Sequence, residues 1–455
     1  METMWDKYTS KDVDKVFKFV DDYKEFISNN KTEREFCSSS LELAKKNGFK
    51  DLLTVKKLKT GDKVYIINRN KEICLFVVGK RDIEQGLNVV GAHMDSPRLD
   101  IKMHPLYEDH GIALLDTHYY GGIKKYQWVA HPMSLHGVVC KKDGTTVNIK
   151  IGEKEDDPVF GISDLLVHLA KDQMAKKGNE VIEGEDLNVT VGSMPLKGKS
   201  ENKVKEYILD LLKKEYDIEE KDFESAELEV VPSGKARDYG LDRSMVMAYG
   251  QDDKVCAYTS LRAILDIKDP EVTACCMLVD KEEVGSQSTT GMHSRFFQDS
   301  LRELINLLKG DFNELMLART LRNSKVLSTD VTAAFDPNYP SVNELKNTAF
   351  FGKGVGFAKY TGSRGKSGSN DACAEYIAKV RNVMDKNKVG YQFAELGKVD
   401  QGGGGTIAYI FGNLNMDVID AGTPVQNMHA CYEVTSKADI YESYHANVAF
   451  FKDMK

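Results

Sequence analysis

Four short apolar runs of the sequence end in histidine or acidic residues. The runs are VVGAHMD at 89–95, CCMLVDKEEVG at 275–285, KVLSTD at 325–330 and the neighbourhood of NMHACYE at 427–433. A fifth segment, GQDDKV at 250–255, stands at the entry to a helical stretch. In open α/β sheets ligands bind beyond the carboxyl ends of the strands, so we expect these polar groups to converge on one crevice.

The side chains in these segments that can do chemistry combine histidine nitrogen with carboxylate oxygen. They are His93, Asp252, Glu283, Asp330 and His429. A mixed set suits zinc or a similar divalent ion better than the all-oxygen sites of calcium and magnesium. Two histidines and three carboxylates can hold two metal ions, and ions about 3.5–4 Å apart can share a water and lower its pKa toward neutrality. The pattern therefore predicts hydrolysis of an amide.

Two further acids would support these ligands. Asp95, two residues after His93, can accept the ring N–H that faces away from the metal and so fix the ring's orientation. Of the adjacent Glu282 and Glu283, one can bind metal while the other takes a proton from the shared water and delivers it to the leaving amine. Spacing alone leaves open which glutamate does which.

Each motif taken singly has a simpler explanation. A lone histidine at a strand end is usually a structural residue, and an acidic pair is usually solvated surface. The prediction rests instead on several such groups following apolar strands, where exposed faces are not expected. The GGGG run at 402–405 lacks the spacing of a phosphate-binding loop. Because no GxSxG motif is present, nucleophilic serine chemistry is not indicated.

The composition disfavours other classes of protein. The chain of 455 residues has 62 Lys plus Arg against 70 Asp plus Glu, a net charge of −8, which excludes an electrostatic nucleic-acid binder. No apolar run approaches the roughly 18 residues of a membrane-spanning helix, and the first residues lack the apolar stretch of a secretory signal. The 8 cysteines form no CxxC pair. We therefore expect a protein of the reducing cytoplasm that contacts neither nucleic acid nor membrane.

The elements that must position these residues can be read from the apolar spacing. The spacing predicts a helix over 11–27 behind a cap at Ser10, and a second helix near 33–47. Short apolar runs at 63–68, 73–79 and 87–93 predict buried strands. From about residue 245 strand-like and helix-like runs alternate, which indicates a mixed, mainly parallel α/β sheet sandwiched by helices.

A second domain is expected inside the first. Asp252 follows His93 by 252 − 93 = 159 positions, whereas a parallel crossover needs a dozen or more. Runs at 136–142 and 145–151 flank Asp143-Gly144, a hairpin signal, and a helix is expected to start near Ser200 and Glu201. The sequence thus predicts a catalytic domain of residues 1–102 and 241–455 with an inserted β-rich domain of residues 103–240.

Four ordered motifs resemble those of a known family. They are GAHMDSPRLD at 91–100, DKEEVGS at 280–286, STDVTAAFDPNY at 328–339 and NMHACYE at 427–433. Together they are similar to the motif set of the aspartyl aminopeptidase family of dinuclear zinc metallopeptidases, and the chain is identified as a bacterial member. The resemblance covers nearly the whole chain. It implies a zinc-exopeptidase type of fold and metallo-aminopeptidase activity with two divalent ions per subunit, zinc first, with cobalt or manganese as alternatives.

The resemblance also implies roles for the individual residues. One metal would be held by His93, Asp252 and Asp330, and the other by Asp252, Glu283 and His429, so that Asp252 is the bridge. Glu282 corresponds to the general base. A metal-bridging hydroxide would attack the scissile carbonyl of a peptide, and Asp95 would orient His93.

Further expectations concern assembly and substrate. The inserted domain resembles the family's oligomerisation domain, whose members form tetrahedral homododecamers. His168 resembles a histidine that reaches a neighbouring subunit's site to help position substrate. The region around Lys359 is similar to the part of relatives that recognises an acidic side chain, which implies removal of N-terminal Asp or Glu.

The sequence is also compatible with other functions. Many relatives have an Asn after the bridging Asp, whereas this chain has Gln251-Asp252-Asp253-Lys254. A neutral or broad-specificity aminopeptidase is one alternative. A two-metal deacylase or carboxypeptidase is another, because the same chemistry serves those substrates. A non-enzymatic scaffold with a structural metal site would leave Glu282 without a role.

Overall fold

The protein folds as two compact units in a computed structural model that describes residues 1–198 and 201–455. The first unit comprises residues 1–96, 236–428 and 433–455, and the second comprises residues 97–235 and 429–432. The domain boundaries expected at 103 and 240 stay a prediction. The compact units divide instead between Ser96 and Pro97 and between Lys235 and Ala236.

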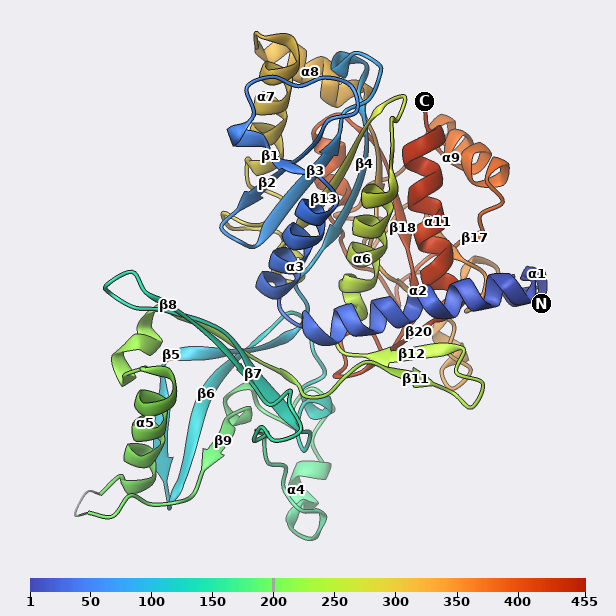
Figure 1. Cartoon of the computed structure of the whole chain (residues 1–455). Helices are drawn as coiled ribbons and strands as arrows, with labels where there is room; N and C mark the ends of the chain where they lie inside the picture. Colours follow the sequence, from blue (N-terminus) through green and yellow to red (C-terminus); the bar gives the residue numbers. More distant parts are fainter. Residues whose placement is uncertain (199–200) are drawn as a thin grey trace. The chain divides into compact units, whose positions relative to one another are not determined.

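The first unit is built on a nine-stranded mixed sheet (Figure 1). In spatial order its strands are β1 (Lys50–Asp51), β2 (Lys63–Asn68), β3 (Glu72–Val77), β13 (Thr273–Val279), β4 (Leu87–His93), β14 (Lys325–Ser328), β18 (Asp417–Gly422), β16 (Val355–Ala358) and β17 (Tyr391–Phe393). The central strands β13, β4, β14 and β18 are parallel to one another. Every residue of β4 and β13 is buried, as expected for parallel strands covered on both faces.

Helices cover both faces of this sheet (Figure 1). They are α1 (Met4–Lys7), α2 (Ser10–Asn29), α3 (Glu33–Lys46), α6 (Gln251–Asp266), α7 (Phe296–Lys309), α8 (Glu314–Asn323), α9 (Ala374–Lys386), α10 (Ala408–Asn413) and α11 (Lys437–Asp453). The cap predicted at Ser10 is wrong by one residue. The hydroxyl of Thr9 accepts the backbone N–H of Asp12, and the Asp12 carboxylate accepts the N–H of Thr9.

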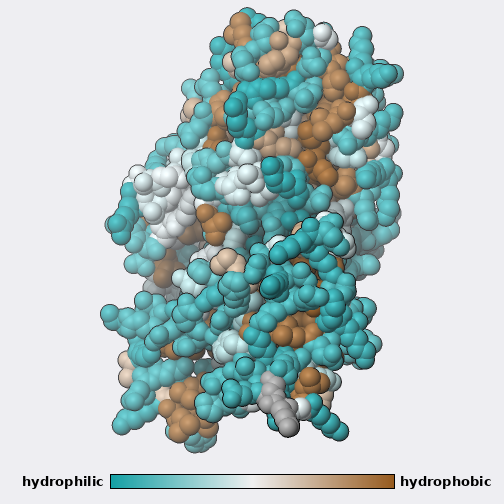
Figure 2. Space-filling view, turned by 90° about the vertical axis from the view of Figure 1, so that its left-hand side faces the viewer, coloured by the Kyte–Doolittle hydropathy of each residue, from teal (hydrophilic) through white to brown (hydrophobic). Residues whose placement is uncertain are grey.

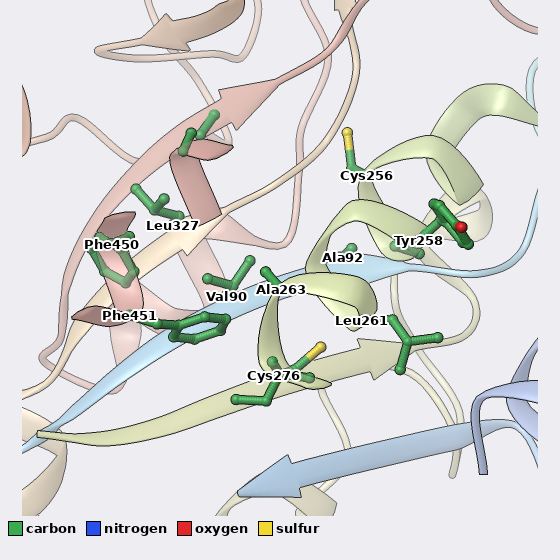
Figure 3. Close-up of a cluster of buried hydrophobic side chains, with 14 of the residues drawn as sticks. Val90, Ala92, Cys256, Tyr258, Leu261, Ala263, Cys276, Leu327, Phe450 and Phe451 are labelled. Carbon is green, nitrogen blue, oxygen red and sulfur yellow. The ribbon is translucent and has the colours of Figure 1, made fainter. Parts of the chain in front are cut away.

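The alternation of side chains along the strands divides the core into two clusters. Val90 and Ala92 of β4 pack with the residues of α2, α6 and α11, whereas Val89 packs with those of α7, α8 and α10. Figure 3 shows the first cluster, in which Val90 and Ala92 lie near Ala263 of α6 and Phe451 of α11. The strand end that carries His93 is therefore held by packing on both faces.

The first unit also contains a small five-stranded sheet. Its order is β11 (Arg237–Tyr239), β12 (Met245–Ala248), β20 (Glu433–Ser436), β19 (Pro424–Gln426) and β15 (Thr332–Ala333). Strand β12 runs directly into the turn before α6, and β20 runs directly into α11. This sheet thus fixes where α6 begins.

Among its described residues, 97–198, 201–235 and 429–432, the second unit forms a six-stranded antiparallel sheet with two helices. Its order is β8 (Thr146–Ile151), β7 (Met133–Cys140), β10 (Ala226–Pro232), β5 (Arg98–Asp109), β6 (Ile112–Tyr120) and β9 (Val189–Gly192), and its helices are α4 (Lys171–Met174) and α5 (Lys203–Tyr216). The hairpin predicted at Asp143-Gly144 joins β7 to β8. Ser200, where a helix start was expected, lies outside the described residues.

The fold predicted from the sequence is confirmed: a mixed, mainly parallel sheet between helices, with a β-rich insertion. No helix among residues 1–198 and 201–455 is long and apolar enough to cross a membrane. Figure 2 shows one face of the molecule, on which hydrophilic residues dominate and hydrophobic ones gather in separate patches. All eight cysteines are free thiols.

Candidate metal centre

The candidate site lies at the carboxyl ends of the parallel strands. His93 is the last residue of β4 and pairs in register with Val279, the last residue of β13. The chain beyond β13 forms a short 3₁₀ turn, Glu282–Val284, and Asp330 follows β14 by two residues. Because parallel strands end at the same edge of a sheet, these polar segments share one rim, as the sequence predicts.

His93 stands at the centre of the acidic side chains. Its Nε2 atom lies 3.3 Å from Asp252 Oδ1, 3.8 Å from Asp330 Oδ2 and 3.9 Å from Glu282 Oε2. Its other ring nitrogen, Nδ1, lies 3.0 Å from the backbone oxygen of Asp95 and 3.3 Å from its Oδ1. With Nδ1–H directed at Asp95, the Nε2 lone pair faces the carboxylates, which is the orientation a metal-binding histidine needs.

Two groups of three side chains have ligand atoms within 4.8 Å of one another. The first is His93, Asp252 and Glu283, and the second is His93, Asp253 and Asp330. Of the five predicted ligands, His93, Asp252, Glu283 and Asp330 fall in these groups. The ligand roles themselves stay predictions.

Asp253 was not among the predicted ligands. Its side chain is buried, its Oδ2 accepts the backbone N–H of His93 at 3.4 Å, and its Oδ1 has no hydrogen-bond partner among the residues that the structure describes. Burial and the charge of Asp330 hold the pKa of Asp253 well above its usual value. The adjacent pair Asp252-Asp253 is the sequence signal for this position, and the predicted ligand set includes only Asp252.

The donor set fits a divalent cation. Buried carboxylates that crowd one histidine are costly to keep charged unless a positive charge lies among them. Nitrogen from His93 and oxygen from Asp252, Asp253, Glu283 and Asp330 is the mixture that zinc accepts. The unpartnered Oδ1 of Asp253 adds an acceptor that a cation would satisfy.

Glu282 lies near His93 but belongs to neither of the two ligand groups. Its side chain is 16% exposed. Burial raises the pKa of Glu282 to about 8, and the nearby Asp330, Asp95 and Asp252 add to the rise while His93 opposes it. The Asp95 carboxylate accepts the backbone N–H groups of Glu282 and Glu283, each at 3.2 Å. Asp95 therefore ties the end of β4 to the glutamate turn.

The structure does not gather every predicted residue. His429 belongs to the second unit, where its Nδ1 lies 2.6 Å from the backbone oxygen of Gly122, and neither ligand group contains it. His168 is exposed in a 3₁₀ turn of the second unit, Val167–Leu169. Lys359 is exposed directly after β16. The roles expected for these three residues stay predictions.

The sheet, with a histidine and carboxylates at the carboxyl edge of its parallel strands, defines a zinc-exopeptidase fold. The family model of the aminopeptidase I zinc metalloproteases (M18) matches residues 26–451. The chain therefore belongs to the M18 family of zinc metallo-aminopeptidases and is a peptide hydrolase, as its sequence resemblance implies.

Individual relatives agree with the family match. A probable M18 family aminopeptidase 1 from Clostridium acetobutylicum is 56% identical over 454 residues, 99% of this chain and 97% of the relative. The crystal structure of an M18 aminopeptidase from Thermotoga maritima is similar with a TM-score of 0.96 at 44% identity, covering 99% of each chain. Aminopeptidase I from C. acetobutylicum gives a TM-score of 0.93 at 53% identity, again over 99% of each chain.

Proposed function

We propose that this aminopeptidase uses two divalent ions to remove N-terminal residues from peptides, with zinc as the preferred metal and Glu282 as the general base. The observation that carries the proposal is the gathering of acidic side chains within 4 Å of His93 Nε2, with Glu282 among them. One ion is assigned to His93, Asp252 and Asp330, and the other to Asp252, Glu283 and His429. The short distance from Asp252 to His93 supports Asp252 as the bridge.

Bound divalent ions would supply Lewis acidity and a water activated at neutral pH. Side chains of the protein transfer the proton and orient the reacting groups. Glu282 is partly exposed and adjoins the carboxylates, so it can take a proton from the attacking water and deliver it to the leaving nitrogen. Asp95 keeps the His93 ring in one orientation, and the carboxylates beside His93 can also receive the free α-amine of the peptide.

The experiment that tests this function uses paired substrates. Fluorogenic aminoacyl amides of Asp, Glu, Leu, Met and Arg, each with a free or an acetylated amine, are offered to chelated protein after zinc, cobalt or manganese is restored. The proposal expects metal-dependent turnover of the free amines alone. Turnover of the acetylated substrates would instead identify a deacylase, and cleavage from the carboxyl end of peptides would identify a carboxypeptidase.

Preference for N-terminal Asp or Glu is the narrower form of the proposal. The exposed ammonium of Lys359 could pair with an acidic side chain, and this supports the preference. In the substrate panel, Lys359→Met should then lower kcat/KM on Asp and Glu substrates while leaving Leu unchanged. Equal or better rates of the wild-type enzyme on Leu would make it a neutral or broad-specificity aminopeptidase.

The second unit is proposed as the oligomerisation domain. Several apolar side chains around His168 are exposed, among them Leu166, Val167 and Leu169, and Val167 is 77% exposed. Such patches are typical of protein interfaces. The yeast aminopeptidase mApe1, which shares the fold with a TM-score of 0.77 at 20% identity, is a dodecamer. We infer a tetrahedral homododecamer in which His168 reaches a neighbouring subunit's site.

Light scattering tests the assembly. A dodecamer should give twelve times the 51.0 kDa chain mass, and Val167→Asp should release smaller species. His168→Ala should keep the assembly but raise KM or lower kcat. A wild-type monomer with full activity would remove this part of the proposal.

A further inference from the structure

The first turn of α6 lacks the usual side-chain cap. The residue before it is Gly250, which has no side chain to accept a backbone N–H group of this turn. The backbone N–H of Asp252 instead donates to Glu433 Oε2 at 2.9 Å. The Asp252 N–H is thus bonded to a side chain 181 residues further along the chain.

Glu433 is held in place for this contact. It is 1% exposed, it begins β20, and it pairs in register with Ala248 of β12. The side chain of Gln251 donates from Nε2 to the backbone oxygen of Glu433 at 2.7 Å. Because strand pairing and the Gln251 contact hold the Glu433 backbone, the Glu433 carboxylate is kept opposite the Asp252 N–H.

The backbone carbonyl of Asp252 is also held by a hydrogen bond. Ser96 Oγ donates to the backbone oxygen of Asp252 at 2.5 Å, and Lys254 Nζ donates to Ser96 Oγ at 2.6 Å. Both Ser96 and Lys254 are buried. A Cβ atom at Gly250, where φ is +69°, would lie 2.9 Å from both Lys254 Nζ and Ser96 Oγ, so only glycine leaves room for this pair.

Asp252 needs such restraint because its backbone is not helical. Its φ and ψ are −77° and 107°, those of Asp253 are −114° and 22°, and the two residues form a kink near the start of α6. This backbone directs the carboxylate toward His93, 3.3 Å away. A return to helical dihedrals would turn the side chain elsewhere.

We propose that Glu433 and the Lys254–Ser96 pair are positioning residues that hold the Asp252 backbone from both sides and so set the affinity of the site for its metal. This inference rests on the proposed role of Asp252 as a metal ligand. It gives Lys254, which stands two residues after the proposed bridging Asp252, a function next to the site. Neither Glu433 nor Lys254 is required to touch the metal or the peptide.

Zinc affinity of the full-length protein tests the proposal, measured by competition with a fluorescent zinc chelator. Glu433→Leu removes the acceptor, whereas Glu433→Gln keeps an oxygen for the Asp252 N–H and removes only the charge. We expect Glu433→Leu to weaken zinc binding about 10–100-fold, the usual scale for residues that orient ligands. Glu433→Gln should stay near the wild-type affinity.

A matched control separates positioning from general packing. Glu442 is also 1% exposed and also accepts a backbone N–H, that of Gly390 at 2.6 Å, but on α11. Glu442→Leu should lower the melting temperature and leave the zinc affinity of the folded protein unchanged. An equal loss of zinc affinity in Glu442→Leu would overturn the proposal.

Ser96→Ala provides a second test should Glu433→Leu not fold. It breaks the link between Lys254 and the Asp252 carbonyl, and we expect weaker zinc binding with little change in melting temperature. Unchanged zinc affinity in folded Glu433→Leu or in Ser96→Ala would overturn the positioning role while leaving the aminopeptidase intact. Wild-type protein that binds no zinc would instead remove the metal centre itself.

Discussion

His93 Nδ1 lies 3.3 Å from Asp95 Oδ1, and the same carboxylate accepts the backbone N–H groups of Glu282 and Glu283. One side chain thus orients a proposed ligand and anchors the turn that carries the base. Asp95→Asn should disturb both, because its amide group must turn an N–H toward a donor. We expect zinc affinity to fall about 10–100-fold in chelator competition. Unchanged affinity would mean that the His93 ring is oriented without the Asp95 side chain, by the Asp95 backbone oxygen 3.0 Å from Nδ1 and by packing.

Glu282→Gln should separate catalysis from metal binding. The substitution keeps the shape of the side chain and removes its ability to take a proton. We expect metal content equal to wild type and kcat lower by about 10²-fold or more, the scale of a lost acid-base group. Atomic absorption and steady-state kinetics on a free-amine substrate measure the two quantities. Near-normal kcat would exclude Glu282 as the base.

The adjacent aspartates should respond differently to substitution. Asp252→Ala should leave fewer than two zinc equivalents per chain, because it removes the proposed bridge. Asp253→Asn should retain both, since Asn is the residue that many relatives have there. His93→Ala serves as the positive control for metal loss. Two zinc equivalents in Asp252→Ala, or their loss in Asp253→Asn, would move the bridge to Asp253.

Glu72 makes the stability of the folded protein depend on pH. Its carboxyl is buried at the start of β3, Asn68 Nδ2 donates to its Oε2 at 2.6 Å, and burial raises its pKa to about 8 from 4.5. Between pH 4.5 and about pH 8, Glu72 keeps a proton in the folded state that it has lost in the unfolded state. The resulting stabilisation is complete below about pH 4.5 and is lost as the pH rises through 8.

Glu72→Gln stays neutral and should escape this loss. The difference in melting temperature between variant and wild type should therefore increase in favour of the variant from pH 5.5 to 7.5, with a slope in unfolding free energy of at most about 1.4 kcal/mol per pH unit. Glu303→Gln, at an exposed position on α7, is the matched control. A constant difference across this range would show that Glu72 is ionised in the folded protein.

The strands that carry the site were predictable because they are continuous apolar runs. LNVVGAH is strand β4 residue for residue, and parallel strands bring their ends together without further information. Asp253 was missed because side-by-side acids are usually on the surface, and only burial distinguishes this pair. Glu433 was missed because it acts on a backbone N–H, which leaves no pattern in the sequence. The grouping of His429 with the second unit likewise depends on tertiary contacts.

The order of the proposed ligand residues along the chain also determines when the site can form. His93 is synthesised early, but the second unit is made next, and Asp252, Glu283 and Asp330 follow it. Glu433, which accepts the Asp252 N–H, comes later still. A ribosome-bound nascent chain therefore has no complete ligand set until most of its 455 residues have been made. Truncated translation products that end before Asp252 contain only His93 of the proposed ligands, and they lack the means to hold zinc in this site.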